Sequence, residues 1–239
     1  MDTHKVAYGD KTIAFELERK KMKTVRLRIR PDGRVIVSAN PKVPHSFIEG
    51  FVREKGHWIN RKLKQFKDTA NLNGHREYVS GETVRYLGRQ YRLKVFESDE
   101  EEVKYYRGYI HIYVRDKNNY SRKEELYEHW LKKKAKEAIH DSLDRIYPRL
   151  EKHNIAKPTL TVRRMSSRWG SCSANKGKIT INIQLVKAPK ACIDYVILHE
   201  LIHFKHPNHN KNFYIFLTNL MPDWKQRKAI LDSEIVCEL

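Results

Sequence analysis

His199, Glu200 and His203 have the side-chain types and the spacing that metal-assisted hydrolysis requires. In a helix, residues four positions apart lie on one face, so the two histidines can bind a single cation. Glu200 directly follows the first histidine and can reach a water that the cation acidifies. The pattern predicts a zinc hydrolase in which Glu200 is the catalytic general base.

A catalytic zinc needs three protein ligands and one open position, and His206 and His209 are the nearby candidates for the third. The residues at 207–208, a proline and an asparagine, should end the helix and turn the chain back. We therefore predict that His199, His203 and His209 hold one Zn²⁺ per chain, with His206 beside the site or on the surface. Three neutral imidazoles favour zinc over manganese or cobalt.

Other ligand sets have weaker support. No acidic residue lies between Pro207 and Pro222, so a glutamate ligand on the next helix is poorly supported, and Asp223 and Glu234 are remote alternatives. A structural metal site would need a fourth protein ligand, for which Cys172 is the obvious candidate.

The elements that must position these residues form an α+β pattern. Alternating apolar runs around turn residues predict hairpins over 25–38, 84–95 and 103–114. Apolar spacing over 46–66 predicts a helix with Ser46 as its N-cap. We expect a strand-rich domain over residues 1–118.

The second predicted domain spans residues 119–239, after the polar segment 116–119. A long helix is expected over 121–153, because Ser121 and Glu124 have the form of a capping box. The further expected elements are strands over 159–162 and 178–183, a metal-binding helix opened by Pro189, and short helices over 213–220 and 224–231.

The net charge of +19 and the pI near 9.8 favour anionic partners, including nucleic acid. The alternative is a solvated basic surface without a specific partner. The chain has no apolar run of about 18 residues and no apolar leader, so neither a membrane span nor a secretory signal is expected. The three cysteines have irregular spacing, which predicts a reducing, cytoplasmic setting.

A basic stretch over residues 19–30 contains seven lysines and arginines and no acidic residue. Strand periodicity places Arg26, Arg28 and Arg30 on one face, where they could bind phosphates of a nucleic acid. The solvent face of a sheet is the alternative interpretation. Tyrosines that could stack on bases, although strands are generally rich in tyrosine, are Tyr105, Tyr106, Tyr109 and Tyr113.

Several segments together resemble the YgjP-like metallopeptidase family, which is similar to the SprT-like and Wss1-like zinc proteases. The segments that carry the resemblance, over nearly the whole chain, are Leu27–Val37, Gly81–Gly88, Ser167–Ser173, Ile179–Asn182, Asp194–His203 and Asn208–Phe213. The resemblance implies zinc ligands at His199, His203 and His209, with Glu200 as general base. It also implies a compact zincin-like domain in which a small sheet packs on the metal-binding helix and a preceding long helix.

The segment from Arg168 to Cys172 precedes a strand that is expected beside the metal-binding helix. Arg168 or Ser171 could therefore polarise a carbonyl or a phosphate of the substrate. The structural alternative assigns Gly170 to a bend or a close approach and Cys172 to a small buried position.

We predict a zinc-dependent metallopeptidase that acts on a protein or peptide. One alternative is a metal-dependent nucleotide hydrolase, because the same chemistry could attack a phosphoanhydride and such a role has been attached to this group. The other is a nucleic-acid-binding module with a structural metal site. SprT-like and Wss1-like relatives cut proteins crosslinked to DNA, which the chain's positive charge would suit.

Overall fold

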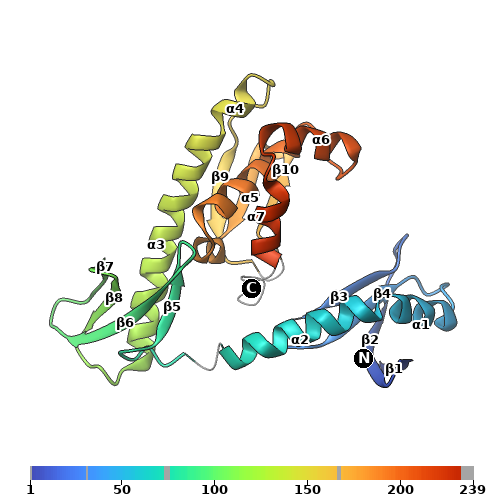
Figure 1. Cartoon of the computed structure of the whole chain (residues 1–239), viewed down its shortest axis with the longest axis horizontal. Helices are drawn as coiled ribbons and strands as arrows, with labels where there is room; N and C mark the ends of the chain where they lie inside the picture. The colour runs from blue at the N-terminus through green and yellow to red at the C-terminus, as the bar shows by residue number, and fades with distance from the viewer. Residues whose placement is uncertain (1, 31, 73–75, 166–167, 233–239) are drawn as a thin grey trace. The chain divides into compact units, whose positions relative to one another are not determined.

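The computed structural model describes residues 2–30, 32–72, 76–165 and 168–232 (Figure 1). The chain divides into two units, Met1–His75 and Arg76–Leu239, and has a mixed α+β fold. The division falls between residues 75 and 76 and not near residue 118. Strands between 83 and 114 pack on the long helix that follows them and therefore belong to the second unit.

The first unit is a four-stranded sheet with two helices in its described part. The elements are β1 (Asp2–Tyr8), β2 (Lys11–Arg19), β3 (Arg26–Ile29), β4 (Val35–Ala39), α1 (His45–Glu54) and α2 (Gly56–Leu72). The strand order is β1-β2-β4-β3; β2 and β4 are parallel and the other pairs are antiparallel. The β3–β4 pair confirms the hairpin predicted over 25–38. Phe15, Val37, Ile48 and Ile59 are buried in one apolar core of this unit.

The helix predicted over 46–66 is instead two helices, α1 and α2. The N-cap of α1 is Pro44, so the prediction of Ser46 as the cap is wrong. The start of α2 lies against β1, where a Cβ added to Gly56 would come within 2.3 Å of the Tyr8 ring. A new helix therefore starts at a residue without a side chain, which permits this close approach.

The second unit contains two sheets and the helices between and after them. Its elements are β5 (Thr83–Tyr86), β6 (Arg89–Glu97), β7 (Glu102–Tyr106), β8 (Tyr109–Val114), α3 (Tyr120–Ile146), α4 (Pro148–Glu151), β9 (Thr159–Arg163), β10 (Gly170–Ser173), η1 (Ala174–Lys176), β11 (Lys178–Asn182), η2 (Ile183–Lys187), α5 (Lys190–Ile202), α6 (Lys211–Leu220) and α7 (Trp224–Ile230). The strand orders are β5-β6-β8-β7 and β10-β11-β9. The predicted hairpins over 84–95 and 103–114 are confirmed.

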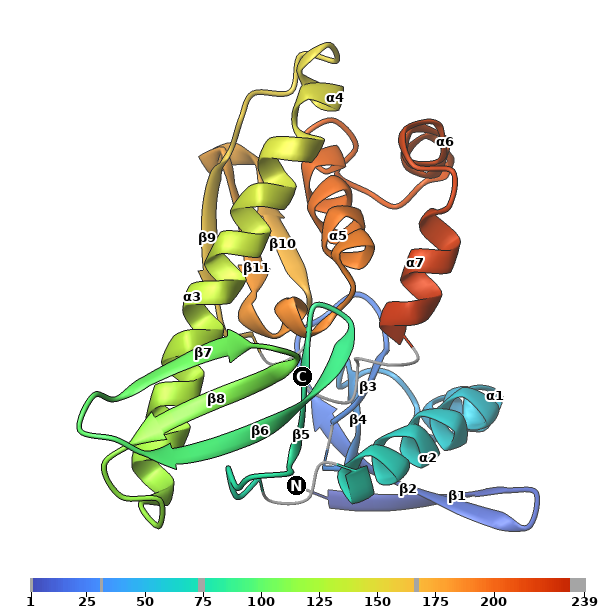
Figure 2. The ribbon, with the colours of Figure 1, turned by 60° about the vertical axis from the view of Figure 1, so that its left-hand side comes forward.

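Helix α3 connects the two sheets of this unit. It contacts β7 and β8 of the first sheet and β9 of the second, and it also packs on α5 (Figure 2). Its N-cap is Asn119, whose side chain accepts a hydrogen bond from the Arg122 backbone N–H at 3.0 Å. Ser121 therefore lies inside the first turn and not at the predicted cap. The helix ends at Ile146, because Pro148 starts the separate α4.

A polar clamp holds α5 against α3. The Ser142 hydroxyl donates to one oxygen of Asp194 at 2.6 Å, and Arg145 donates to the same oxygen at 2.6 Å. Since α5 carries His199 and Glu200, this clamp fixes the helix that presents them.

The β5–β6 turn lies directly against the start of α5. The backbone N–H groups of Leu87 and Gly88 donate to the carbonyls of Val186 and Lys187 at 2.8 and 3.0 Å. Gly88 has a φ of +79°, and a Cβ there would lie 2.8 Å from the Pro189 Cα. Only glycine combines this backbone conformation with so close an approach. Among the described residues, no helix has the length and apolar character needed to cross a membrane.

Candidate metal centre

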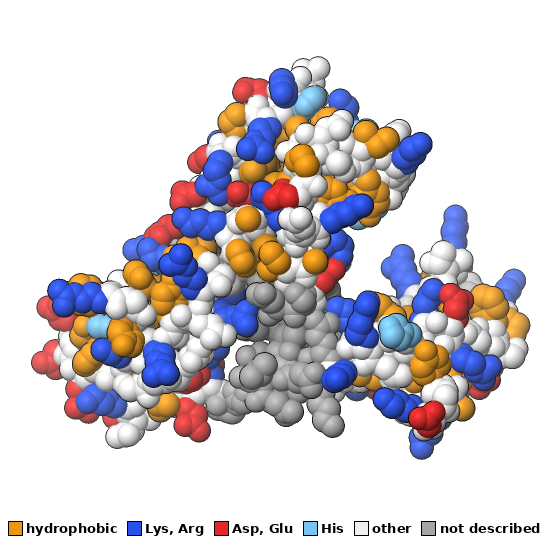
Figure 3. Space-filling view, in the orientation of Figure 1, with side chains coloured by type: hydrophobic (Ala, Val, Ile, Leu, Met, Phe, Trp, Pro, Cys, Tyr) orange, Lys and Arg blue, Asp and Glu red, His pale blue; other side chains and the backbone are white. Residues whose placement is uncertain are grey.

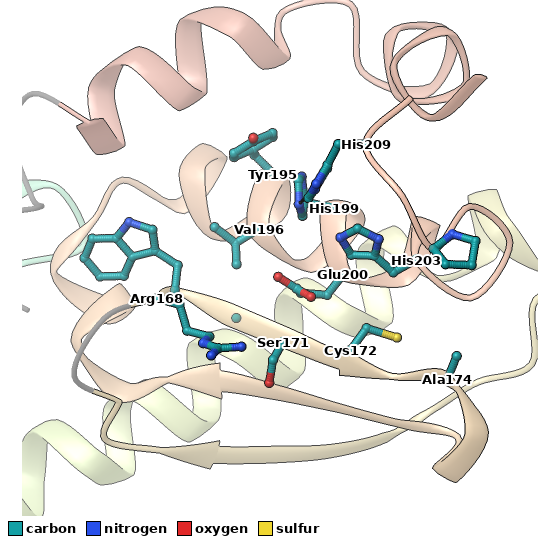
Figure 4. Close-up of a pocket in the computed structure, with 13 residues that line it drawn as sticks. Arg168, Ser171, Cys172, Ala174, Tyr195, Val196, His199, Glu200, His203 and His209 are labelled. Atoms are coloured by element: carbon teal, nitrogen blue, oxygen red, sulfur yellow. Dashed lines mark hydrogen bonds between the residues drawn. The ribbon is translucent and has the colours of Figure 1, made fainter. Parts of the chain in front are cut away.

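Three imidazoles converge on one point of the second unit. His199 lies on α5, His203 directly follows the helix, and His209 lies on the segment that leads to α6. Their candidate ligand atoms all lie within 4.8 Å of one another (Figure 4). The Nε2 atoms of His199 and His209 are 2.8 Å apart.

The chain brings His209 to this point by a turn between α5 and α6. The Asn210 backbone N–H donates to the Asn208 carbonyl at 2.8 Å, and the Asn210 side chain caps α6. Phe213 in the first turn of α6 is fully buried, and its ring centroid lies 4.8 to 5.0 Å from all three imidazoles. It forms an apolar support for the three rings, a role that sequence reasoning missed. Its position three residues after the helix cap was the available signal.

The backbone of His206 orients the ring of His203. The distance from His203 Nδ1 to the His206 carbonyl oxygen is 3.1 Å, and since a carbonyl only accepts, Nδ1 carries the proton. The Nε2 lone pair of His203 is then available to a cation. The His206 imidazole itself packs on Phe216 and is not part of the three-histidine cluster.

Burial keeps two of the imidazoles, those of His199 and His203, neutral. Burial, followed by positive charge on His203 and His209, lowers the pKa of His199 to about 3. Burial also lowers the pKa of His203. Neutral imidazole is the form that binds a metal, and two Nε2 lone pairs that face each other at 2.8 Å repel unless a proton or a cation lies between them. The donor set therefore fits a metal ion.

Glu200 is buried and lies on the α5 side of the same cavity. Burial raises the pKa of its carboxyl to about 7, and the positive charge of Arg168 opposes part of that rise. A Cβ added to Gly170 would lie 2.7 Å from both Cγ and Oε1 of Glu200. Gly170 on β10 thus permits a close approach of the strand to this carboxylate, as the sequence suggested.

The cavity around these groups has a volume of about 580 Å³. Strand β10 and the residues before it form one wall, and α5 with the His209 segment forms the other (Figure 4). Arg168, Ser171 and Cys172 lie in the β10 wall. Burial, and then the negative charge of Glu200, raise the pKa of the Cys172 thiol to about 11, and the thiol lies outside the three-histidine cluster.

Asn182 positions the Arg168 segment, and sequence reasoning missed this role. The side chain is fully buried and donates to the carbonyls of Met165 and Arg168 at 2.8 and 3.0 Å. Its backbone N–H donates to the Trp169 carbonyl at 2.8 Å. A polar residue that ends a buried strand was the signal in the sequence.

Of the remaining predicted residues that the structure describes, none belongs to the three-histidine cluster. Asp223 forms an ion pair with Arg227 at 2.8 Å and does not join the cluster, whereas Glu234 lies outside the described residues. In the first unit, Arg26, Arg28 and Arg30 are all exposed.

A carboxylate partly neutralises the arginine face of β3. Glu18 lies 3.6 Å from Arg28, and it also accepts from Lys20 at 2.6 Å. In the strand order, β4 lies between β3 and β2, which carries Glu18. The face therefore mixes both signs of charge, which weakens the interpretation of these arginines as a phosphate-binding ridge.

Comparison with known proteins identifies the family of the chain. The sequence model of the YgjP-like metallopeptidase domain matches residues 23–234, and the chain belongs to this family. Its members are classed as metallopeptidases, that is, as metal-dependent hydrolases. Among solved structures, the metallopeptidase zymogen jannalysin of Methanocaldococcus jannaschii is 26% identical with a TM-score of 0.34, over 39% of this chain and 93% of that chain. No curated protein matched the chain.

Proposed function

We propose that the protein is a zinc-dependent peptidase in which Glu200 is the general base. The observation that carries this proposal is the buried Glu200 carboxylate beside three convergent imidazoles in an open cavity. Three protein ligands with a further open position are typical of catalytic zinc sites, whereas structural sites use four protein ligands.

His199, His203 and His209 would hold the ion. A bound Zn²⁺ would supply Lewis acidity, which polarises a carbonyl and lowers the pKa of a coordinated water. Glu200 accepts a proton from the attacking water and then delivers it to the amine that leaves. The buried position of Glu200 keeps competing bulk water away from this proton transfer.

The position of β10 favours a peptide as the substrate. This strand lies at the edge of its sheet and lines the cavity, so one side of its backbone has no strand neighbour among the described residues. An extended peptide can add to such an edge through main-chain hydrogen bonds. Arg168 and Ser171 in this wall would then contact the substrate carbonyls.

Nucleotide hydrolysis is less well supported. A triphosphate is usually bound by several cationic groups or by a helix N-terminus. Of the described side chains that line the cavity, Arg168 alone has a permanent positive charge. A purely structural metal site is also disfavoured, because Cys172 does not join the histidine cluster.

The test compares wild type with Glu200→Gln in metal content and in hydrolysis. We expect the variant to retain zinc and to lose cleavage of an unfolded protein by roughly 10²-fold or more. Nucleoside triphosphates and a protein–DNA crosslink serve as parallel substrates. Triphosphate hydrolysis without peptide cleavage would reject the peptidase assignment, and unchanged cleavage by the variant would reject the role of Glu200.

A further inference from the structure

The sheet formed by β5 to β8 has one face against α3 and one face that no described helix of the second unit covers (Figure 2). Five rings gather on the uncovered face and form what we term the aromatic face. They are Phe96 on β6, Tyr106 on β7, and Tyr109, His111 and Tyr113 on β8.

The register of the sheet creates this cluster. His111 pairs with Lys94 of β6 and with Lys104 of β7, so it occupies the middle of the face. Phe96 pairs with Tyr113 in the next row, and their rings stack at 5.2 Å with an interplanar angle of 20°. Every side chain of the aromatic face lies at an alternate strand position, opposite the positions that contact α3.

Two of these rings are unusually exposed for apolar groups. Phe96 is 37% exposed and Tyr106 is 49% exposed, and both pack against His111, with ring centroids 5.1 and 5.7 Å away. His111 is itself buried, and its Nε2 has no hydrogen-bond partner among the described residues. Two exposed rings that flank a buried ring, with two half-buried rings beside them, form a surface that can bind a ligand.

Cations lie directly over the rings of the aromatic face. The ammonium of Lys94 is 3.9 Å from the centroid of the Tyr109 ring, and that of Lys104 is 4.6 Å from the centroid of Tyr113. The guanidinium of Arg107 is 5.2 Å from the centroid of Tyr106. Figure 3 shows Lys and Arg side chains among hydrophobic ones over this sheet. Rings interleaved with cations suit a ligand that alternates flat bases with phosphates.

Acidic residues define one end of the face, where Glu102 of β7 pairs with Tyr113 and forms an ion pair with Lys104. The β6–β7 connection contains Asp99, Glu100 and Glu101, next to the row of Phe96 and Tyr113. Glu101 forms an ion pair with Arg122 at 2.7 Å. The opposite end carries an exposed arginine, Arg92, in register with Tyr109. Phosphates are therefore expected at that end, away from the acidic connection.

We propose that the aromatic face binds single-stranded nucleic acid, with bases stacked on Phe96 and Tyr106 and with phosphates near Lys94 and Arg92. A duplex fits less well, because its bases are stacked within the helix and offer no free ring face. This site is separate from the metal centre, and the proposal does not depend on peptidase activity.

The test measures binding of the full-length protein to a labelled oligothymidylate of about 15 nucleotides by fluorescence anisotropy. An abasic oligomer of equal length presents the same phosphates without bases. We expect wild type to prefer the oligothymidylate by about 5-fold or more, and Phe96→Ala/Tyr106→Ala to lose that preference. An oligouridylate of equal length distinguishes RNA from DNA.

The neighbouring Tyr105 provides a matched control. It is 51% exposed but lies on the same strand with the opposite orientation, since it pairs with Ile110 and contacts Tyr91. Tyr105→Ala should bind like wild type, and Tyr106→Phe, which keeps the ring, should also retain the preference. Lys94→Ala should lower the slope of log affinity against log salt by about 1.

Three results would overturn the proposal. They are equal wild-type affinity for the abasic and base-bearing oligomers, equal losses in Tyr105→Ala and Tyr106→Ala, and equal competition by a duplex of the same length. The first of these results would assign any binding to the net charge of +19 alone. If the alanine variants fold poorly, the comparison of base-bearing, abasic and duplex oligomers on the wild-type protein still decides the proposal.

Discussion

Gly170→Ala should reduce catalysis by displacing Glu200 while leaving the fold intact. The added Cβ would lie 2.7 Å from Cγ and Oε1 of Glu200 and 2.9 Å from its Cδ, whereas ordinary contacts begin at 3.4 Å. The carboxylate must therefore withdraw by about 0.7 Å, and misplacement of a catalytic group by about 1 Å costs about 10²-fold in rate. We expect kcat to fall by between about 10-fold and 100-fold, which is about 1.4 to 2.7 kcal/mol of transition-state stabilisation.

The stability of the variant should change little. The atoms that must move belong to a side chain beside an open cavity, so we expect a change of less than about 1 kcal/mol in the free energy of unfolding. The assay is kcat and KM on a peptide substrate of the zinc-loaded protein, together with metal content and urea denaturation.

Gly50→Ala is the matched control. Gly50 lies in α1, and a Cβ there would meet no atom within 4 Å. This substitution should leave kcat unchanged and stabilise the helix by up to about 1 kcal/mol. A wild-type kcat in Gly170→Ala would refute the reasoning, as would loss of folding or a change confined to KM.

Three further predictions concern the metal centre and its supports. His209→Gln should weaken zinc binding by more than about 100-fold, whereas His206→Gln should stay within about tenfold of wild type, as measured by competition with a chromogenic chelator. Asn182→Ala and Asp194→Ala should each lower the free energy of unfolding by about 1 to 3 kcal/mol, because each substitution leaves polar partners unpaired. Urea titrations measure this change, and an unchanged free energy of unfolding for either variant would contradict the role assigned to that residue. Removal of zinc by a chelator, from a solution with free zinc at about 1,000 times its Kd, should lower the free energy of unfolding by about 4 kcal/mol. Calorimetry should then show a fall of about 8 to 16 °C in Tm, and an unchanged Tm would argue against a bound metal.

The convergence of the three histidines is the feature of the candidate site that followed most directly from the sequence. His199 and His203 are four residues apart in a helix, and a proline–asparagine turn returns His209, so short-range rules suffice. The partners of these groups were not predictable in the same way. Phe213 and Asn182 act through contacts whose distances and burial only the folded chain reveals.

The hairpins were also predictable, since each depends on adjacent alternating runs and a turn between them. The residues at which helices start were less predictable. Asn119 caps α3 in place of Ser121, because several polar residues near a helix start can compete for one role.

The sequence by itself determined the class of chemistry and the local elements, because helical spacing and turn residues act over a few positions. Only the tertiary structure decided the division between the units, the approach of Gly170 to Glu200, and the grouping of Phe96, Tyr106 and His111 on one face. Each of these depends on which strands become neighbours and in what register. Strand pairing over long sequence separations is set by packing of the whole core and not by any local pattern.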